Sequence, residues 1–389
     1  MSNWQTVKLS DIFTLQMGKT PSRDNSAYWN GTHNWVSIAD LSKTTKYIVS
    51  TKESITDLAV SETGIKATPK DTVVMSFKLS IGKTAVTAEE TYTNEAIMSF
   101  IDKGVYDVDI DYIFHLFSGK DWSKGTNKAV MGVTLNKATL SQILIPLPPL
   151  ETQRQIAANL DKVTHTIDLC NNILEKLDLL VKARFVEMFG DIVHDDNIPK
   201  VLLSELADIG SSKRIYANEY VDDGIPFYRS KEIRELGSGL KPTTELFITN
   251  ERYKEIKKKY GVPKRGDILI AAIGATIGYS WIVDTEKPFY YKDGNLIILS
   301  VKDNVNSVFL NHTMGIIIED FKNKGVSGSA QLALTIEKLE KMPIVNPDLT
   351  LQNQFAAFVE QTDKSKSAVK KVLEKAETLK KALMQEYFG

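Results

Sequence analysis

Two short phrases, Gly18-Lys19-Thr20 and Gly82-Lys83-Thr84, have the residue types that close a phosphate-binding loop. Such a loop also needs a glycine five residues before its Gly-Lys pair, and these positions hold Phe13 and Phe77. The Asn-Pro-Pro-aromatic arrangement of adenine methyltransferases is also missing from the sequence. Nucleotide hydrolysis and methyl transfer are therefore not indicated for this chain.

Other catalytic and metal-binding signatures are also missing. The five histidines are scattered without a metal-binding spacing, and the single cysteine, Cys170, has no partner for a disulfide or a thiolate metal site. Glu255-Ile256-Lys257 matches the tail of a nuclease motif but lacks the upstream Asp-Pro. We therefore expect no metal, no cofactor and no catalysis on this chain.

Local basic patches are more informative than the net charge, which is -1 from 48 basic and 49 acidic residues. Residues 251–265 hold seven basic side chains, two acidic ones and two tyrosines, a pattern typical of a phosphate-facing surface. A second patch runs from Gly18 to Arg23 and continues to Tyr28 and Trp29. The structural alternatives are a solvated helix face for the first patch and a turn packed on the core for the second.

The composition is that of a folded protein of two or three domains. Hydrophobic residues make up 42% of 389 residues, which is enough to fill a core. The longest nearly uncharged apolar stretch, 268–278, is far shorter than the ~20 residues of a membrane span. Met1 is followed by no secretory leader. We expect a cytoplasmic protein with no membrane partner.

The sequence contains an internal repeat with an offset near 199 residues. Residues 145–157 share Ile, Pro, Leu, Gln, Gln and Ala with residues 344–356. Each copy then continues for about forty residues to the phrase Phe189-Gly190 or Phe388-Gly389. Strand-like runs at Thr72–Met75, Asp267–Ile270 and Asn295–Val301 predict a mixed α and β unit in each half.

A long helix is predicted from Leu150 to Phe189, beginning after Pro149 and ending at Gly190. At 1.5 Å per residue it would extend roughly 60 Å. Its apolar residues recur at the 4,3 spacing of a coiled-coil seam. These residues are Ile156, Leu160, Val163, Ile167, Cys170, Leu174, Leu177 and Val181.

A second helix near the C-terminus is expected to pair with the first. Shifting the seam by 199 residues gives positions that include Val369, Leu373 and Ala376, but also the polar Thr362, Lys366 and Lys380. A local change of register that brings in Val372, Leu379 and Leu383 would restore an apolar seam. Two-fold pairing of like units favours antiparallel helices with one globular unit at each end.

In these features the sequence resembles the specificity subunit of type I restriction-modification enzymes. The resemblance rests on the ordered phrases 17–23, 28–31, 35–37, 81–83 and 94–97, and above all on 143–157 with the helix that follows. The second half departs from the pattern, because 210–214 lacks the proline and Asp293-Gly294-Asn295 replaces the Asn-Glu-Ala phrase.

The resemblance implies an α+β fold with two tandem target recognition domains in a pseudo-two-fold repeat, separated by two long helices that pair as an antiparallel coiled coil. The implied domains are residues 1–149 and 191–347, with helical spacers at 150–190 and 348–389. It further implies a bipartite, asymmetric DNA target, modification (methyltransferase) subunits that carry S-adenosylmethionine, and restriction subunits that are ATP-dependent translocase-nucleases.

Base and phosphate contacts call for basic, amide and aromatic side chains on loops that reach a groove. The candidates chosen from charge and loop position are Lys19, Arg23, Tyr28, Lys78, Lys83, Arg214, Tyr216, Arg229, Lys231, Lys257 and Lys258. Two alternatives within DNA binding are a subunit serving a fused methyltransferase-nuclease and an orphan copy. An alternative outside it is a protein scaffold that docks partners through the coiled coil.

Overall fold

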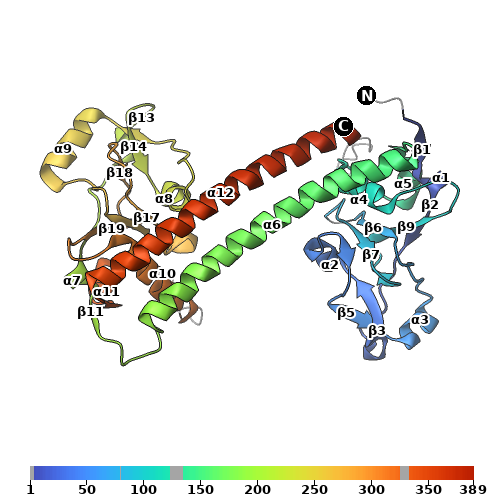
Figure 1. The fold of residues 1–389 in the computed structure, drawn as a ribbon, viewed down its shortest axis with the longest axis horizontal. Helices are drawn as coiled ribbons and strands as arrows, with labels where there is room; N and C mark the ends of the chain where they lie inside the picture. Colours follow the sequence, from blue (N-terminus) through green and yellow to red (C-terminus); the bar gives the residue numbers. More distant parts are fainter. Residues whose placement is uncertain (1–3, 79, 123–134, 325–332) are drawn as a thin grey trace. The chain divides into compact units, whose positions relative to one another are not determined.

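The computed structural model describes residues 4–78, 80–122, 135–324 and 333–389, which form two compact units (Figure 1). The first unit comprises Met1–Asn172 with Lys370–Gly389, and the second comprises Ile173–Val369. Each unit contains strands, short helices and part of both long helices, so the α+β class is confirmed.

The first unit is built on three small sheets. A five-stranded sheet has the order β2-β9-β6-β7-β4, a three-stranded sheet has the order β5-β3-β8, and β1 pairs with β10. The strands are β1 (Thr6–Lys8), β2 (Phe13–Met17), β3 (Trp29–Val36), β4 (Tyr47–Ile48), β5 (Glu53–Ile55), β6 (Val73–Ser76), β7 (Thr84–Thr87), β8 (Tyr92–Thr93), β9 (Ile97–Asp102) and β10 (Leu144–Pro146).

Helices cover these sheets and complete the core of the first unit. They are α1 (Leu9–Ile12), η1 (Ser26–Tyr28), α2 (Ile38–Lys43), α3 (Asp57–Thr63), α4 (Ile110–Gly119) and α5 (Lys137–Ser141). Helix α4 is apolar almost all round and packs on the main sheet, where Phe117 meets Phe13 and Phe100 edge to face. The buried aromatic cluster explains why this helix needs no polar face.

The second unit repeats this plan. Its sheets have the orders β12-β19-β16-β17 and β13-β15-β14-β18, and β11 pairs with β20. The strands are β11 (Lys200–Leu202), β12 (Ala207–Gly210), β13 (Tyr220–Val221), β14 (Ile225–Tyr228), β15 (Phe247–Ile248), β16 (Ile268–Ala271), β17 (Ser280–Ile282), β18 (Tyr290–Tyr291), β19 (Leu296–Val301) and β20 (Pro343–Val345). The helices are α7 (Leu203–Leu206), η2 (Ala217–Glu219), α8 (Ser230–Gly237), α9 (Asn250–Tyr260), η3 (Gly274–Thr276), α10 (Ser307–Lys324) and α11 (Ile336–Glu340).

The strand orders show that the two units share one topology. The series β2-β9-β6-β7 corresponds to β12-β19-β16-β17, and β5-β3-β8 corresponds to β15-β14-β18. Each smaller sheet contains a parallel strand pair, β3 with β8 in the first unit and β14 with β18 in the second. From the second strand of the pair the chain continues directly into the larger sheet, at β9 or β19. The internal repeat of the sequence is therefore a repeat of structure.

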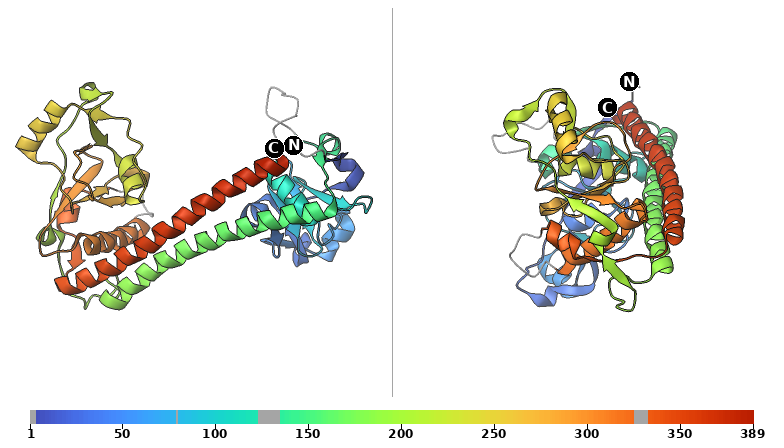
Figure 2. Two further views of the ribbon diagram at one scale, coloured as in Figure 1. Left: turned by 45° about the horizontal axis from the view of Figure 1, so that its top comes forward. Right: turned by 90° about the vertical axis from the view of Figure 1, so that its left-hand side faces the viewer.

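Two forty-residue helices follow the globular parts: α6 (Leu150–Phe189) and α12 (Leu349–Phe388). Helix α6 has the predicted bounds and ends at Gly190, whose φ of 75° is the left-handed conformation of a helix terminus. In the first unit the end of α12 lies beside the start of α6 (Figure 2). There the Asn159 side chain on α6 lies 3.5 Å from the Tyr387 hydroxyl on α12. In the second unit Phe355 of α12 contacts Phe185 of α6. The helices therefore run antiparallel.

Helix α12 keeps the seam positions that lie 199 residues after those of α6, without a local change of register. Phe355, Val359, Thr362 and Ala376 are buried, and Lys366 is half-buried. Val372 and Leu379 are about half exposed, so the change of register does not bring them into the seam, whereas Leu383 is half-buried against the core of the first unit. The polar residue is accommodated because Lys366 Nζ lies 2.7 Å from Asp178 Oδ1 on α6. An ion pair across the helices therefore replaces an apolar contact without moving the register.

Within the described residues, every helix is too short or too polar to cross a membrane.

Candidate nucleic-acid interface

The loop after β2, residues 18–23, carries the first predicted DNA contacts and is fixed by its backbone. Gly18 lies so close to the β8–β9 loop that a Cβ there would be 2.1 Å from the Thr93 carbonyl oxygen. The Lys19 N–H donates to the same carbonyl at 2.8 Å. The Trp35 indole N–H donates to the Lys19 carbonyl at 3.1 Å. Glycine is therefore required here, and the loop is held in one conformation.

Arg23 at the end of this loop is held by an aromatic ring and a carboxylate. Its guanidinium carbon lies 3.8 Å from the centre of the Trp29 ring, which is the geometry of a cation–π contact. Both terminal nitrogens donate to Glu53 on β5, with Nη2 3.0 Å from Oε2. Hydrogen bonding to Arg23 lowers the pKa of Glu53. The guanidinium is thus oriented before any ligand arrives.

Lys19 and Tyr28 both contact α3. The Lys19 ammonium donates to the Thr63 carbonyl, and the Tyr28 hydroxyl donates to Glu62 Oε2 at 2.8 Å. This hydrogen bond raises the pKa of Tyr28. Both side chains therefore fasten the loop to a helix as well as presenting polar groups at the surface.

Lys78 lies near Glu95, a carboxylate that also interacts with Thr20 and Arg23 of the loop 18–23. A hydrogen bond from Thr20 is the main reason that the pKa of Glu95 is lowered, and the charges of Lys78 and Arg23 lower it further. Lys78 and Arg23 are therefore near enough to Glu95 to act on its charge, while the ion pair of Arg23 is with Glu53. Lys83 is exposed at the other end of the β6–β7 loop.

The corresponding loop of the second unit carries Arg214 and Tyr216. Arg214 Nε lies 2.7 Å from Asp293 Oδ2, in the loop between β18 and β19 that corresponds to the loop of Glu95. The Arg214 side chain is 64% exposed and the Asp293 side chain only 16%, so a fixed carboxylate holds a surface arginine. Tyr216 is also exposed.

Helix α9 covers most of the basic run 251–265, in agreement with the helical alternative given for this patch. Arg252 is not a free cation, because it pairs with Glu219 at 2.8 Å and with Glu255 at 2.7 Å. Lys257 and Lys258 are exposed and belong to the last turn, where positive charge also stabilises the helix dipole.

Arg229 and Lys231 meet at one carboxylate. Arg229 Nη2 lies 3.0 Å from Glu232 Oε1 and 3.3 Å from Glu245 Oε2, while Lys231 Nζ lies 3.4 Å from Glu245 Oε1. Glu232 is fully buried at the start of α8. Arg229 therefore neutralises a buried charge, in addition to the DNA contact predicted for it.

A pair of buried glutamines was missed as a functional feature, although their recurrence was visible in the sequence. Gln153 at the start of α6 accepts from the Asp109 N–H at 2.9 Å and donates to the Pro148 carbonyl at 2.8 Å. Gln352 at the start of α12 accepts from the Asn306 N–H at 2.9 Å and donates to the Pro347 carbonyl at 2.8 Å. Each glutamine ties a long helix to its globular part.

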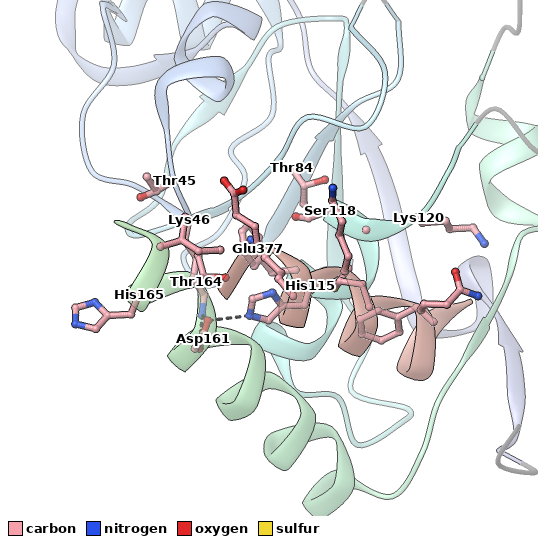
Figure 3. Close-up of a pocket in the computed structure, with 18 of the residues that line it drawn as sticks. Thr45, Lys46, Thr84, His115, Ser118, Lys120, Asp161, Thr164, His165 and Glu377 are labelled. Carbon is pink, nitrogen blue, oxygen red and sulfur yellow. Dashed lines mark hydrogen bonds and ion pairs between the residues drawn. The ribbon is translucent and has the colours of Figure 1, made fainter. Parts of the chain in front are cut away.

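A cavity of about 1280 Å³ lies within the first unit between α4, α6 and α12 (Figure 3). On its wall His115 Nε2 lies 2.8 Å from Asp161 Oδ1, and Lys46 Nζ lies 2.8 Å from Asp161 Oδ2. Burial lowers the pKa of His115. In the second unit burial likewise lowers the pKa of His312, on the corresponding helix α10. This network ties α6 to the globular part and contains none of the predicted DNA contacts.

Comparison with known proteins identifies the chain. The family described as the type I restriction modification DNA specificity domain matches residues 1–179 and again residues 196–379. The chain belongs to this family. The two matches correspond to the two copies of the structural repeat, so this specificity subunit carries two specificity domains in tandem.

Two named relatives and a solved structure are consistent with this family assignment. The MjaIX specificity subunit of Methanocaldococcus jannaschii is 26% identical over 381 residues, which are 92% of this chain and 86% of that protein. A Haemophilus influenzae protein, named as a candidate type I specificity subunit, is 32% identical over 236 residues, 58% of this chain and just over half (57%) of its own length. The crystal structure of the S subunit from M. genitalium has the same fold, with a TM-score of 0.61 at 15% identity and coverage of 100% and 96%.

A specificity subunit is a DNA-recognition component of its system rather than an enzyme. The described residues hold no group of three or more His, Cys, Asp or Glu side chains that could bind a metal ion.

Proposed function

We propose that residues 1–149 and 191–347 of this specificity subunit are recognition domains, each of which reads one half of a bipartite, asymmetric DNA target. The observation that carries this proposal is one topology with two different opening loops. The strand orders are shared, but residues 18–23 and 210–214 present different side chains on equivalent supports. Equal scaffolds with unequal loops suit a target whose halves differ in sequence.

The proposed contacts divide into two chemical groups. Arginines with a fixed orientation, such as Arg23 and Arg214, suit direct reading of base edges. Exposed lysines, such as Lys257 and Lys258, suit phosphates, which position a protein without specifying sequence. The remaining proposed contacts are Lys19, Tyr28, Lys78, Lys83, Tyr216, Arg229 and Lys231.

The helical spacers 150–190 and 348–389 are proposed to set the gap between the half-sites and to dock the partner subunits. Leu179 and Val186 on α6 and Val372 and Leu379 on α12 are about half exposed, as a docking surface requires. The partners are modification subunits, which bind S-adenosylmethionine, and restriction subunits. Such a complex acts on chromosomal and incoming DNA, so we place it in the cytoplasm.

In two alternatives the chain still binds DNA: it is the specificity subunit of a fused methyltransferase-nuclease, or an orphan copy without partners. A protein scaffold that does not bind DNA is the third. Ionic strength separates the third from the others, because phosphate contacts release counterions and make affinity fall steeply with salt.

The test is selection of bound duplexes from a random DNA library by the full-length chain, followed by a salt series on the selected sequence. We expect a gapped two-part sequence and an affinity that falls with salt. Recovery of no sequence, or an affinity independent of salt, would favour the scaffold.

A further inference from the structure

We propose that Arg23 reads a guanine in the half-site bound by the first unit, and that Glu53 and Trp29 position it for this contact. The inference deepens the proposed DNA-binding function and rests on it. It follows from which N–H groups of Arg23 donate hydrogen bonds to Glu53, and from the negative charge of the Glu53 carboxylate.

The occupied groups leave one complete edge of the guanidinium free. A guanidinium carries five N–H donors in a rigid plane. Glu53 takes one from Nη1 and one from Nη2, which is the end edge. The Nε–H and the second N–H of Nη2 form the side edge, and among the described residues nothing accepts from Nε. Three donors therefore remain, and two of them, on Nε and Nη2, are parallel; the side chain is 52% exposed.

Two parallel donors match one base edge in the major groove. Guanine presents two acceptors there, O6 and N7, whereas adenine presents one acceptor and one donor and thymine one acceptor. A bidentate contact requires the guanidinium plane to be fixed, and here the plane is fixed from two sides. Trp29 lies 3.8 Å from the guanidinium, and its own indole N–H is anchored to the Ser22 carbonyl at 3.1 Å.

Because Glu53 is negatively charged, a phosphate is a poorer ligand than guanine for the free edge of Arg23. The Arg23–Glu53 pair has no net charge, and Glu53 would repel a phosphate placed beside it. A guanine edge is neutral and suffers no such repulsion. Lys257 and Lys258 provide the contrast, because they are exposed and form no ion pair with a carboxylate among the described residues.

Glu53 is placed to remain in position when DNA binds. It lies in β5 opposite Trp35 of β3, and its carbonyl accepts from the Thr51 hydroxyl at 2.7 Å. Strand pairing fixes the backbone of Glu53, and two hydrogen bonds from Arg23 hold its carboxylate. Glu53 is therefore a positioning residue for the base contact rather than a competitor that DNA must displace.

The experiment uses the full-length chain and the duplex selected from the random library, at one fixed salt concentration. Each guanine of the duplex is replaced in turn by 7-deazaguanine, which lacks the N7 acceptor. Affinities are measured by fluorescence anisotropy for the wild type, Arg23→Lys, Glu53→Gln and the control Glu360→Gln. The control also breaks an exposed ion pair, with Lys364, and changes the net charge equally, but it lies on α12. Circular dichroism verifies that each variant is folded.

We expect the wild type and Glu360→Gln to lose about ten-fold in affinity or more at one particular guanine. Arg23→Lys should lose this dependence while keeping the other sequence preferences. Glu53→Gln should bind the intact duplex more weakly, show a smaller loss at the same guanine, and bind unrelated DNA at least as well as the wild type. Should Arg23→Lys not fold, Glu53→Gln alone decides the question.

Three results would overturn the inference. Arg23→Lys could weaken every duplex equally, which is the behaviour of a phosphate contact, or change nothing. Glu53→Gln could strengthen selected and unrelated duplexes alike, as expected of a competitor. No guanine could prove sensitive in the wild type. A wild-type chain that binds DNA without any sequence preference would instead contradict the proposed function itself.

Discussion

At the scale of single residues, some of the predicted DNA contacts also have a structural role and others do not. Arg23 and Arg214 are surface groups held by carboxylates, while Arg229 also neutralises the buried Glu232. Charge and loop position cannot separate these roles, because the carboxylate partners lie 30 and 79 residues away for the first two. Mutations at the arginines should therefore affect different properties.

Replacing Arg229 with Ala should lower stability as well as DNA binding. The change leaves the Glu232 carboxylate buried, with the backbone N–H of residue 229 as its one partner among the described residues. We expect a loss of about 1–3 kcal/mol in the free energy of unfolding, measured by urea denaturation. Arg234→Ala, an exposed position on the same helix, is the control. Equal stability of the two variants would show that the buried pair contributes little.

The buried His115 and the half-buried His312 should make stability depend on pH. Burial lowers the pKa values of His115 and His312, so the unfolded chain takes up protons first as the pH falls below about 6.5. The free energy of unfolding should therefore decrease between that pH and the lower folded-state pKa. His115→Gln should reduce the slope and the exposed control His165→Gln should not. The surroundings of His115 are Asp161, Lys46 and Lys380, and a slope unchanged by His115→Gln would rule out this origin.

At the scale of elements, the joints between globular parts and long helices are duplicated in their hydrogen bonds. Gln153 and Gln352 make the same two backbone contacts at an offset of 199 residues. A buried amide that satisfies an N–H and a carbonyl fixes where each helix begins. The start of each helix is thus specified by hydrogen bonding as well as by the preceding prolines.

Replacing Gln153 with Leu should loosen this joint. The Asp109 N–H and the Pro148 carbonyl would lose their partner in a buried place, which costs about 1–3 kcal/mol. The loss should appear in chemical denaturation and as faster hydrogen exchange at Asp109. Gln155→Leu, two residues further along on the exposed face, should be near neutral. Comparable losses in both variants would contradict the assigned role.

Sequence periodicity predicted the elements better than their contacts. The bounds of α6 and the strands at 73–76, 268–271 and 296–301 follow from local patterns and were confirmed within a residue or two. The register of α12 was misjudged, because a lysine in the seam looks unfavourable until its partner Asp178 is known. Ion pairs such as Arg23–Glu53 depend on the tertiary fold, so no local pattern reveals them.

At the scale of the whole molecule, the chain is a specificity subunit in which one topology occurs twice. The net charge is close to zero, so affinity for DNA must come from local groups rather than from the overall field. This favours a protein whose binding depends on a few well-placed cations.

Removal of Lys257 and Lys258 together should weaken binding to all duplexes alike. Each phosphate contact contributes roughly 0.9 to the slope of log affinity against log salt, so the double Ala variant should lower the slope by roughly 2. Anisotropy titrations over a salt series measure it. The control is Lys341→Ala with Lys364→Ala, which alters the charge equally at lysines paired with carboxylates. A slope that does not change would remove these lysines from the interface.

The central claim is that two units read two separate half-sites. The most direct measurement is to co-express the chain with its modification subunit and map methylated adenines across the host DNA by sequencing. We expect methylation at one gapped motif with two unlike halves. Methylation at a continuous motif, or at adenines that share no motif despite a stable complex, would contradict it.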